Sequence, residues 1–149
     1  MHDAKPVPLF VRDPLFLLAV AAGPAGWLVL ALILPAAADP TWPLAEPAKF
    51  IIVAALYPVV EEVVFRGLLQ GSLLRTGWGT KRFGALTAAN VLAAVAFAAA
   101  HLVRTSPPWA AAVLVPGLVF GFFRERHGLH AAIVLHVVYN AGFVWLYWG

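Results

Sequence analysis

The sequence predicts an all-α membrane protein, a polytopic bundle of about five transmembrane helices. Of its 149 residues, 62% are hydrophobic and only 11% are charged, and the mean hydropathy is +0.87. Soluble domains average about 45–50% apolar and about 25% charged residues. The basic residues are scattered between apolar runs, so the net charge of +3 indicates membrane topology and not a nucleic-acid-binding face. We therefore expect a single integral-membrane domain over residues 1–149, with the lipid bilayer as partner and no nucleic acid.

The first apolar run begins the series of expected helices. Leu15 to Leu34 is long enough to span about 30 Å at about 1.5 Å per residue, which exceeds a signal-peptide core. Residues 1–48 are expected to form a tail, this first span (about 15–35) and a loop. Residues 49–149 are expected to form the catalytic helix core. Breakers such as Gly77-Trp78-Gly79, Pro107-Pro108 and Gly128 divide the core into four spans, over about 49–72, 83–104, 108–123 and 129–148.

Basic residues alternate between the loops. Lys5 and Arg12 precede the first span, and the second and fourth loops carry Arg75, Lys81, Arg82, Arg124 and Arg126. This alternation predicts an N-terminus inside and a C-terminus outside. Alanine and proline are abundant and lysine is scarce, which indicates a bacterial protein, and so the inner membrane is expected. Tryptophans near the expected span ends are typical of interfacial belts: Trp42, Trp78, Trp109, Trp145 and Trp148.

Two adjacent carboxylates lie inside the second expected span, where an acid costs roughly 2.5–3.5 kcal/mol. Glu62 and Arg66 are at i and i+4, so they share a helix face and can pair. Glu61 is rotated by about 100° onto a neighbouring face. Glu62 would then be neutralised by Arg66, which leaves Glu61 as the better candidate for a general base. The alternative is an ion pair that only holds helices together.

Two further polar patterns lie in other spans. Phe97 and His101 are one turn apart in the third, where the histidine could instead bond a backbone carbonyl. His136 and Asn140 are at i and i+4 in the fifth, and together they can donate two hydrogen bonds to one oxygen, as an oxyanion hole requires. Interhelical hydrogen bonding is the alternative for that pair. One shared site explains the polar groups on three spans more simply than three independent ion pairs or hydrogen bonds that only hold helices together.

The sequence lacks the residues or motifs of several classes of catalytic site. The chain has no cysteine, which excludes disulfides, thiolate nucleophiles and cysteine-based metal sites. Aspartate occurs only outside the expected spans, as Asp3, Asp13 and Asp39, which excludes a two-aspartate intramembrane protease. No His-Glu-x-x-His motif is present. Two mechanisms remain as candidates: water activated by a glutamate, and a metal held by the same groups.

The motifs Glu61-Glu62-x-x-x-Arg66, Phe97-x-x-x-His101 and His136-x-x-x-Asn140, in this order, resemble the CPBP family. This family, also called Abi or CAAX-protease-like, comprises glutamic-type intramembrane endopeptidases. The resemblance covers roughly residues 49–145. It implies that Glu61 activates the attacking water, that His101 holds and polarises this water, and that His136 and Asn140 stabilise the oxyanion. Arg66 and Glu62 would support the site, with Glu62 a second candidate carboxylate.

The expected function is therefore cleavage of a membrane-anchored protein or peptide by an intramembrane endopeptidase that needs no cofactor. A peptide precursor or a C-terminal sorting signal is the expected type of substrate, whereas the sequence does not fix the oligomeric state. One alternative is a zinc metalloprotease that uses Glu61, His101 and His136 as ligands. Another is a non-catalytic membrane immunity or binding protein.

Overall fold

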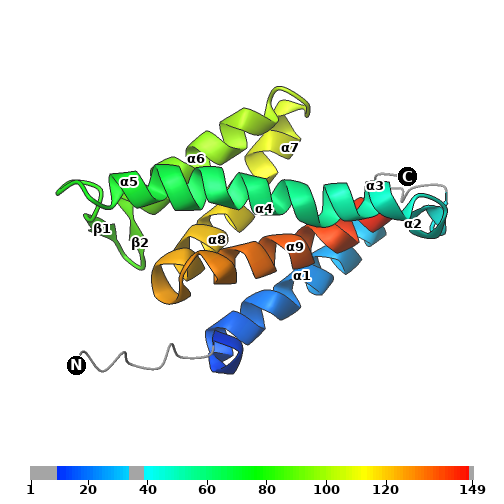
Figure 1. Cartoon of the computed structure of the whole chain (residues 1–149), viewed down its shortest axis with the longest axis horizontal. Helices are drawn as coiled ribbons and strands as arrows, with labels where there is room; N and C mark the ends of the chain where they lie inside the picture. Colours follow the sequence, from blue (N-terminus) through cyan, green and yellow to red (C-terminus); the bar gives the residue numbers. More distant parts are fainter. Residues whose placement is uncertain (1–9, 34–38, 148–149) are drawn as a thin grey trace.

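A computed structural model shows a bundle of helices with one short hairpin, which confirms the all-α prediction (Figure 1). It describes residues 10–33 and 39–147. The helices are α1 (Pro14–Ile33), α2 (Trp42–Ala45), α3 (Pro47–Ile51), α4 (Tyr57–Glu62), α5 (Gly71–Leu73), α6 (Ala88–His101), α7 (Pro107–Ala112), α8 (Leu114–His127) and α9 (Leu129–Tyr147). The remaining elements are the 3-10 turn η1 (Phe10–Arg12), the π-helical segments η2 (Ile52–Leu56) and η3 (Val63–Gln70), and the strands β1 (Arg82–Phe83) and β2 (Leu86–Thr87).

Within the described residues, three helical stretches are long and apolar enough to cross a membrane. They are Pro14–Leu32, Pro107–His127 and Leu129–Tyr147, which match the first, fourth and fifth expected spans. The third expected span corresponds to the shorter apolar helix α6, and the second to a helix that carries the charged residues of the site.

That second helix is built from five segments. α3, η2, α4, η3 and α5 follow one another from Pro47 to Leu73 without a break, and Figure 1 shows them as one long ribbon across the bundle. We call this the site helix. Pro58 lies inside it, where a proline lacks the backbone N–H and its ring crowds the carbonyl four residues earlier. The wider π-helical turn at Ile52–Leu56 ends two residues before Pro58 and contains Ala54, four residues before it, so it gives this carbonyl more room.

The expected start of the third span at residue 83 is wrong. Arg82 pairs with Thr87 and Phe83 with Leu86 in an antiparallel hairpin, whose turn contains Gly84 at φ +63°. Thr87 then caps α6, because its Oγ1 accepts a hydrogen bond from the backbone N–H of Asn90 at 3.0 Å. Helix α6 therefore begins at Ala88.

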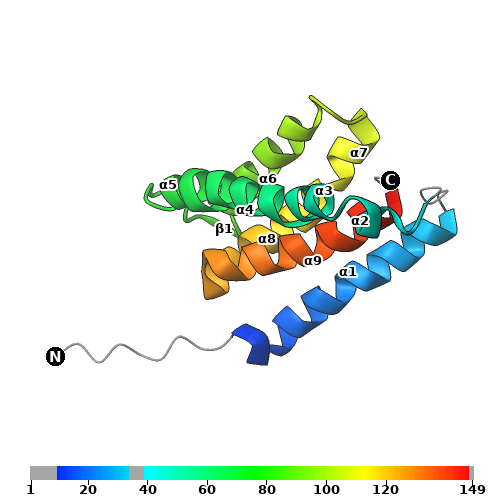
Figure 2. The same ribbon diagram turned by 45° about the vertical axis from the view of Figure 1, so that its right-hand side comes forward.

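Helix α8 is packed between two other helices of the bundle. α8 lies against α6 on one side and α9 on the other, and α1 lies along the outer side of α9 (Figures 1 and 2). Buried side chains of α1, α8 and α9 form an apolar cluster, which contains Phe16, Phe120, Phe123 and Leu135. The site helix crosses α9 and α6 on the opposite side, so the polar residues of three helices face one another.

One of the tryptophans near the expected span ends is buried inside the protein. Trp42 is only 5% exposed, and its Nε1 donates a hydrogen bond to the carbonyl oxygen of Trp145 at 3.1 Å. It is therefore a packing residue that joins α2 to the end of α9. Trp78, Trp109 and Trp145 are exposed, as expected, and Trp148 lies outside the described residues.

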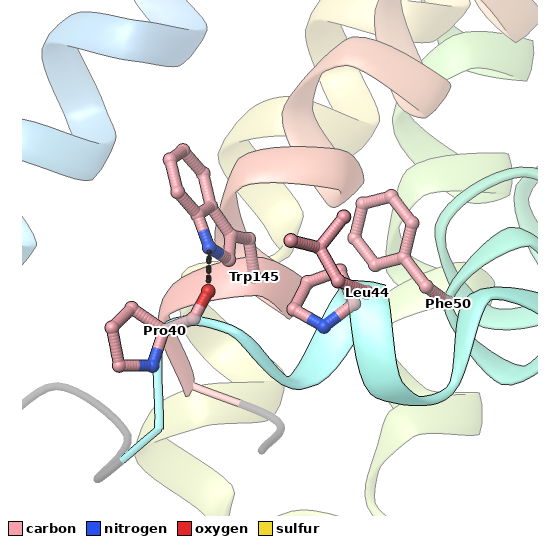
Figure 3. Close-up of a pocket in the computed structure, with 5 residues that line it drawn as sticks. Pro40, Leu44, Phe50 and Trp145 are labelled. Atoms are coloured by element: carbon pink, nitrogen blue, oxygen red, sulfur yellow. Dashed lines mark hydrogen bonds between the residues drawn. The ribbon is translucent and has the colours of Figure 1, made fainter.

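A pocket of about 250 Å³ lies at the same end of the bundle (Figure 3). Its lining residues are Pro40, Pro43, Leu44, Phe50 and Trp145. Trp145 closes one side, and its Nε1 donates to the carbonyl oxygen of Pro40 at 2.8 Å. The lining contains no ionisable side chain, so the reactive groups of the chain lie elsewhere.

Candidate active site

The centre of the site is the buried carboxylate of Glu62. Arg66 lies one turn later on the site helix, with its Nε 3.4 Å from Glu62 Oε2, which confirms the expected pair. Both side chains are fully buried. The guanidinium also donates from Nη2 to the carbonyl oxygen of Gly117 at 2.9 Å and lies 4.6 Å from the centre of the Phe97 ring. Arg66 is thus held by a carboxylate, a carbonyl and an aromatic face.

His136 on α9 contacts both carboxylates of the pair. Its Nδ1 donates to Glu62 Oε1 at 2.9 Å, and its Nε2 lies 3.6 Å from Glu61 Oε2. A carboxylate paired with Arg66 can only accept hydrogen bonds, so the bond to Glu62 places a proton on Nδ1. The opposite nitrogen, Nε2, is thereby directed at Glu61.

Two phenylalanines fix the plane of the His136 ring. Phe120 of α8 stacks on its face, with ring centres 4.7 Å apart and planes at 22°. Phe97 of α6 approaches it edge-on, at 5.5 Å and 89°. With Glu62 at one nitrogen and aromatic rings on its face and side, the imidazole is held in one orientation.

The two carboxylates differ in exposure. The side chain of Glu61 is 34% exposed, whereas that of Glu62 is fully buried. This difference follows from their adjacent positions, which direct them to neighbouring faces of the site helix. Glu61 is therefore the carboxylate of the pair that a molecule outside the packed helices can reach.

His101 reaches the site through Phe97. Its Nδ1–H donates to the carbonyl oxygen of Phe97 at 2.9 Å, and its ring lies 4.6 Å from the Phe97 ring centre. The bond leaves Nε2 as the acceptor nitrogen of the neutral ring. The same phenylalanine thus contacts both site histidines.

Asn140 is directed at the backbone of the site helix. Its Nδ2 donates to the carbonyl oxygen of Val53 at 2.9 Å, in the π-helical segment η2. His136 and Asn140 therefore both face the site helix, as their spacing predicts, but they contact different partners in it. One of the two amide protons of Asn140 is used in this contact.

A second polar group lies one turn beyond Arg66, and sequence reasoning did not identify it. Gln70 is buried and donates from Nε2 to the carbonyl oxygen of Gly121 at 3.1 Å and to Glu125 Oε1 at 2.8 Å. Thr87 donates to the same Glu125 oxygen at 2.6 Å. The spacing of Glu62, Arg66 and Gln70 at i, i+4 and i+8 could have placed Gln70 on the same helix face as the ion pair.

Glycines allow the site helix and α6 to approach α8 this closely. A side chain at Gly121 would overlap the amide of Asn90, whose Nδ2 donates to the carbonyl oxygen of Leu118 at 3.0 Å. A Cβ at Gly117 would lie 3.2 Å from Arg66 Nη2. These contacts hold the site helix in register and so position Glu61 and Glu62.

The alternative zinc ligands do not gather into a metal site. Across residues 10–33 and 39–147, no group of three His, Cys, Asp or Glu side chains is arranged to hold a metal ion. Glu61 and His136 are neighbours, whereas His101 is turned toward Phe97. Among the described residues, Glu61, His101 and His136 do not form such a three-ligand group.

Comparison with known families shows which family the chain belongs to. Residues 43–142, more than half of the chain, match the family model described as type II CAAX prenyl endopeptidase Rce1-like. No curated protein and no solved structure matches. The match confirms the resemblance indicated by the three motifs, and it includes every site residue from Glu61 to Asn140. With its apolar helices, the chain is an integral membrane peptide hydrolase with a membrane-associated peptide substrate, and it belongs to the type II CAAX prenyl endopeptidase Rce1-like family.

Proposed function

We propose that this chain is a glutamic-type intramembrane endopeptidase in which Glu61 activates the attacking water, without a metal or a covalent intermediate. The observation that carries the proposal is the asymmetry of the two carboxylates. Glu62 is fully buried, ion-paired with Arg66 and hydrogen-bonded to His136, whereas Glu61 is 34% exposed and lies beside His136 Nε2. A general base must reach the proton it removes, and Glu61 is the accessible member of the pair.

In the proposed reaction, water bonds to the carboxylate of Glu61 and attacks the carbonyl carbon of the scissile peptide bond. Glu61 takes one proton from this water, and the carbonyl oxygen becomes the oxyanion of a tetrahedral intermediate. The carbon–nitrogen bond then breaks, and Glu61 returns the proton to the leaving nitrogen. The products are a carboxyl terminus and an amine, and the carboxylate of Glu61 is regenerated.

The other residues support this reaction from fixed positions. His101 is proposed to orient the water through its acceptor nitrogen Nε2. His136 is proposed to act as an imidazolium that keeps its Nδ1–H on Glu62 and donates from Nε2–H to the oxyanion. The second amide proton of Asn140 is proposed to donate to the same oxygen. Glu62 holds Nδ1 of His136, and Arg66 offsets the charge of Glu62.

The substrate is proposed to be a membrane-anchored protein or peptide with an apolar segment near the scissile bond, such as a peptide precursor or a C-terminal sorting signal. Apolar side chains flank Glu61 on the exposed face of the site helix. Tyr57 and Val64 lie one turn on either side and are 43% and 44% exposed, and neighbouring Val60 is 52% exposed. An apolar peptide beside this face would bring its backbone to Glu61.

The proposal is tested by cleavage assays in membranes. The wild type and Glu61→Gln are co-expressed with candidate membrane-anchored precursors, and products are read by intact mass. Glu61→Gln should abolish cleavage while the protein still inserts and folds, because the amide cannot accept the proton. Glu46→Gln is the matched control, since Glu46 is an exposed glutamate that only pairs with Lys49 beside it. It should cleave as the wild type does.

Full activity of Glu61→Gln would overturn the proposal. The same assay after chelation with 1,10-phenanthroline separates it from the zinc alternative. We expect cleavage to survive chelation, whereas loss of cleavage that added zinc restores would favour a metalloprotease.

A further inference from the structure

The first helix is joined to α9 by two reciprocal contacts between a glycine and an aromatic ring. A Cβ on Gly23 of α1 would lie 2.9 Å from the ring of Tyr139 on α9. In the opposite direction, Gly142 of α9 lies so close to the indole of Trp27 on α1 that any side chain there would overlap it. Each helix thus receives a large ring of the other at a position without a side chain.

Both rings also bond to backbone across the same interface. Tyr139 donates its hydroxyl proton to the carbonyl oxygen of Ala19 at 2.7 Å. Trp27 donates from Nε1 to the carbonyl oxygen of Tyr139 at 2.9 Å. Polar bonds of this kind are directional, so they set the rotation of α9 about its own axis relative to α1. Figures 1 and 2 show the two helices side by side in both views.

Tyr139 connects this interface to the site. Its ring packs edge-on against Phe120, with centres 5.3 Å apart and planes at 68°. The Phe120 ring stacks in turn on His136, at 4.7 Å. His136 and Tyr139 are one turn apart on α9, and Phe120 of α8 contacts both. A shift of Tyr139 would therefore move the ring that covers the face of His136.

We propose that Tyr139 is a positioning residue through which α1 fixes the orientation of the His136 imidazole between Glu61 and Glu62. The consequence for catalysis rests on the proposed function of His136. Helix α1 lies outside residues 43–142. The contact therefore holds a site residue of the matched segment through a helix that is not part of that segment. The structure offers a close pair of variants to test it, because Gly26 on the same helix has no atom within 4 Å of its Cβ position.

The first measurement compares cleavage by Gly23→Ala and Gly26→Ala in the full chain. The methyl group at position 23 must displace Tyr139, whereas the one at position 26 meets open space. We expect Gly26→Ala to keep wild-type kinetics. Gly23→Ala should lose roughly ten- to a hundredfold in kcat with little change in KM, because small misplacements of a reacting group cost rates of this order. Substrate binding beside the site helix would remain.

The second measurement does not depend on activity. The nitrogen-15 resonances of His136, identified by their loss in His136→Gln, report the protonation of each ring nitrogen and the hydrogen bond to Glu62. They should shift in Gly23→Ala and stay unchanged in Gly26→Ala. Should Gly23→Ala fail to fold, Tyr139→Leu takes its place with Tyr139→Phe as partner. The leucine removes the ring and should shift the signals, and the phenylalanine keeps the ring against Phe120 and should shift them less.

The outcomes are distinct. Shifted resonances together with a reduced kcat support the positioning role. Unchanged His136 resonances in Gly23→Ala and Tyr139→Leu overturn it, whatever the cleavage rates. Shifted resonances in a chain whose wild type cleaves no precursor would support the positioning and count against the proposed function.

Discussion

Charge balance explains why the site can lie inside an apolar protein. Glu62 and Arg66 are both fully buried and neutralise one another, with their N–O distance at 3.4 Å. A buried ion pair contributes little net stability, but removing one partner leaves an isolated charge in an apolar surrounding. The hydrogen bond to the same carboxylate also orients the His136 ring. Glu62 therefore links the stability of the helix bundle to the geometry of the site.

Replacing Glu62 by alanine should lower the free energy of unfolding by about 3–5 kcal/mol, because Arg66 is left buried without its counter-charge. Denaturant unfolding in detergent micelles measures the loss. The double variant Glu62→Ala, Arg66→Met should recover much of the stability without recovering cleavage. Glu46→Ala removes an exposed acid and should change stability by less than about 1 kcal/mol. A single Glu62→Ala variant as stable as the wild type would contradict this assignment.

The sequence predicts the local part of the site and not its long-range contacts. The Glu62–Arg66 pair follows from an i, i+4 spacing, which helix geometry fixes. The contact between His136 and Glu62 joins residues 74 positions apart, so it depends on how the helices pack. The same limit explains why Asn140, whose spacing from His136 is right, is directed at the Val53 carbonyl.

At the scale of elements, Asp13 joins the start of α1 to the end of α8. Its Oδ2 accepts hydrogen bonds from Arg126 Nε at 2.5 Å and from His127 Nε2 at 2.7 Å. These bonds, first that of Arg126 and then that of His127, hold the pKa of the Asp13 carboxyl well below its usual value. The sequence showed Asp13 only as one of three aspartates outside the expected spans. The structure makes Asp13 part of an interhelical contact.

This contact predicts a pH dependence of stability. Because the pKa of Asp13 is lower in the folded than in the unfolded chain, the carboxylate stabilises the fold above about pH 4, the ordinary aspartate value. That contribution is lost as the pH falls from about 4 through the lowered pKa of the folded state. The unfolding temperature of the wild type in detergent should thus fall more steeply with acidification than that of Asp13→Asn. Parallel curves for the two proteins would contradict the contact.

Element boundaries were predictable where a residue type enforces them. Gly128 has a φ of +97° and separates α8 from α9, as its place between two apolar runs predicts. The hairpin of β1 and β2 was missed because two-residue strands are too short to show an alternating pattern. The π-helical segments on both sides of Glu61 and Glu62 were missed as well, since a change of helical turn leaves no periodic signal over so few residues.

At the scale of the whole molecule, three segments that carry or adjoin basic residues lie toward one end. The start of α1, the hairpin and the end of α8 are on the same side of the bundle in Figure 1. Arg82 lies in the hairpin, and Arg124 and Arg126 lie in the last turn of α8. By the positive-inside rule, this grouping predicts that this end of the bundle, and with it the N-terminus, lies inside.

The topology can be tested directly because the chain has no cysteine. Thr80 and Ser106 are exposed and lie in the loops before and after α6. An impermeant maleimide added to intact cells should label Ser106→Cys, and should label Thr80→Cys only after permeabilisation. The opposite pattern would reverse the orientation, and equal labelling of both would show that α6 does not separate two compartments.

The length of α6 has a consequence for the lipid around the site. Its 14 residues rise about 21 Å, against about 30 Å for the hydrocarbon core of a bilayer. Hydrophobic mismatch of this size is accommodated by local thinning of the bilayer or by polar groups that reach its surface. His101 at the end of this helix would then lie close to the headgroups, where water is abundant. A thinned membrane would shorten the path that water and a polar peptide backbone must cross to reach Glu61.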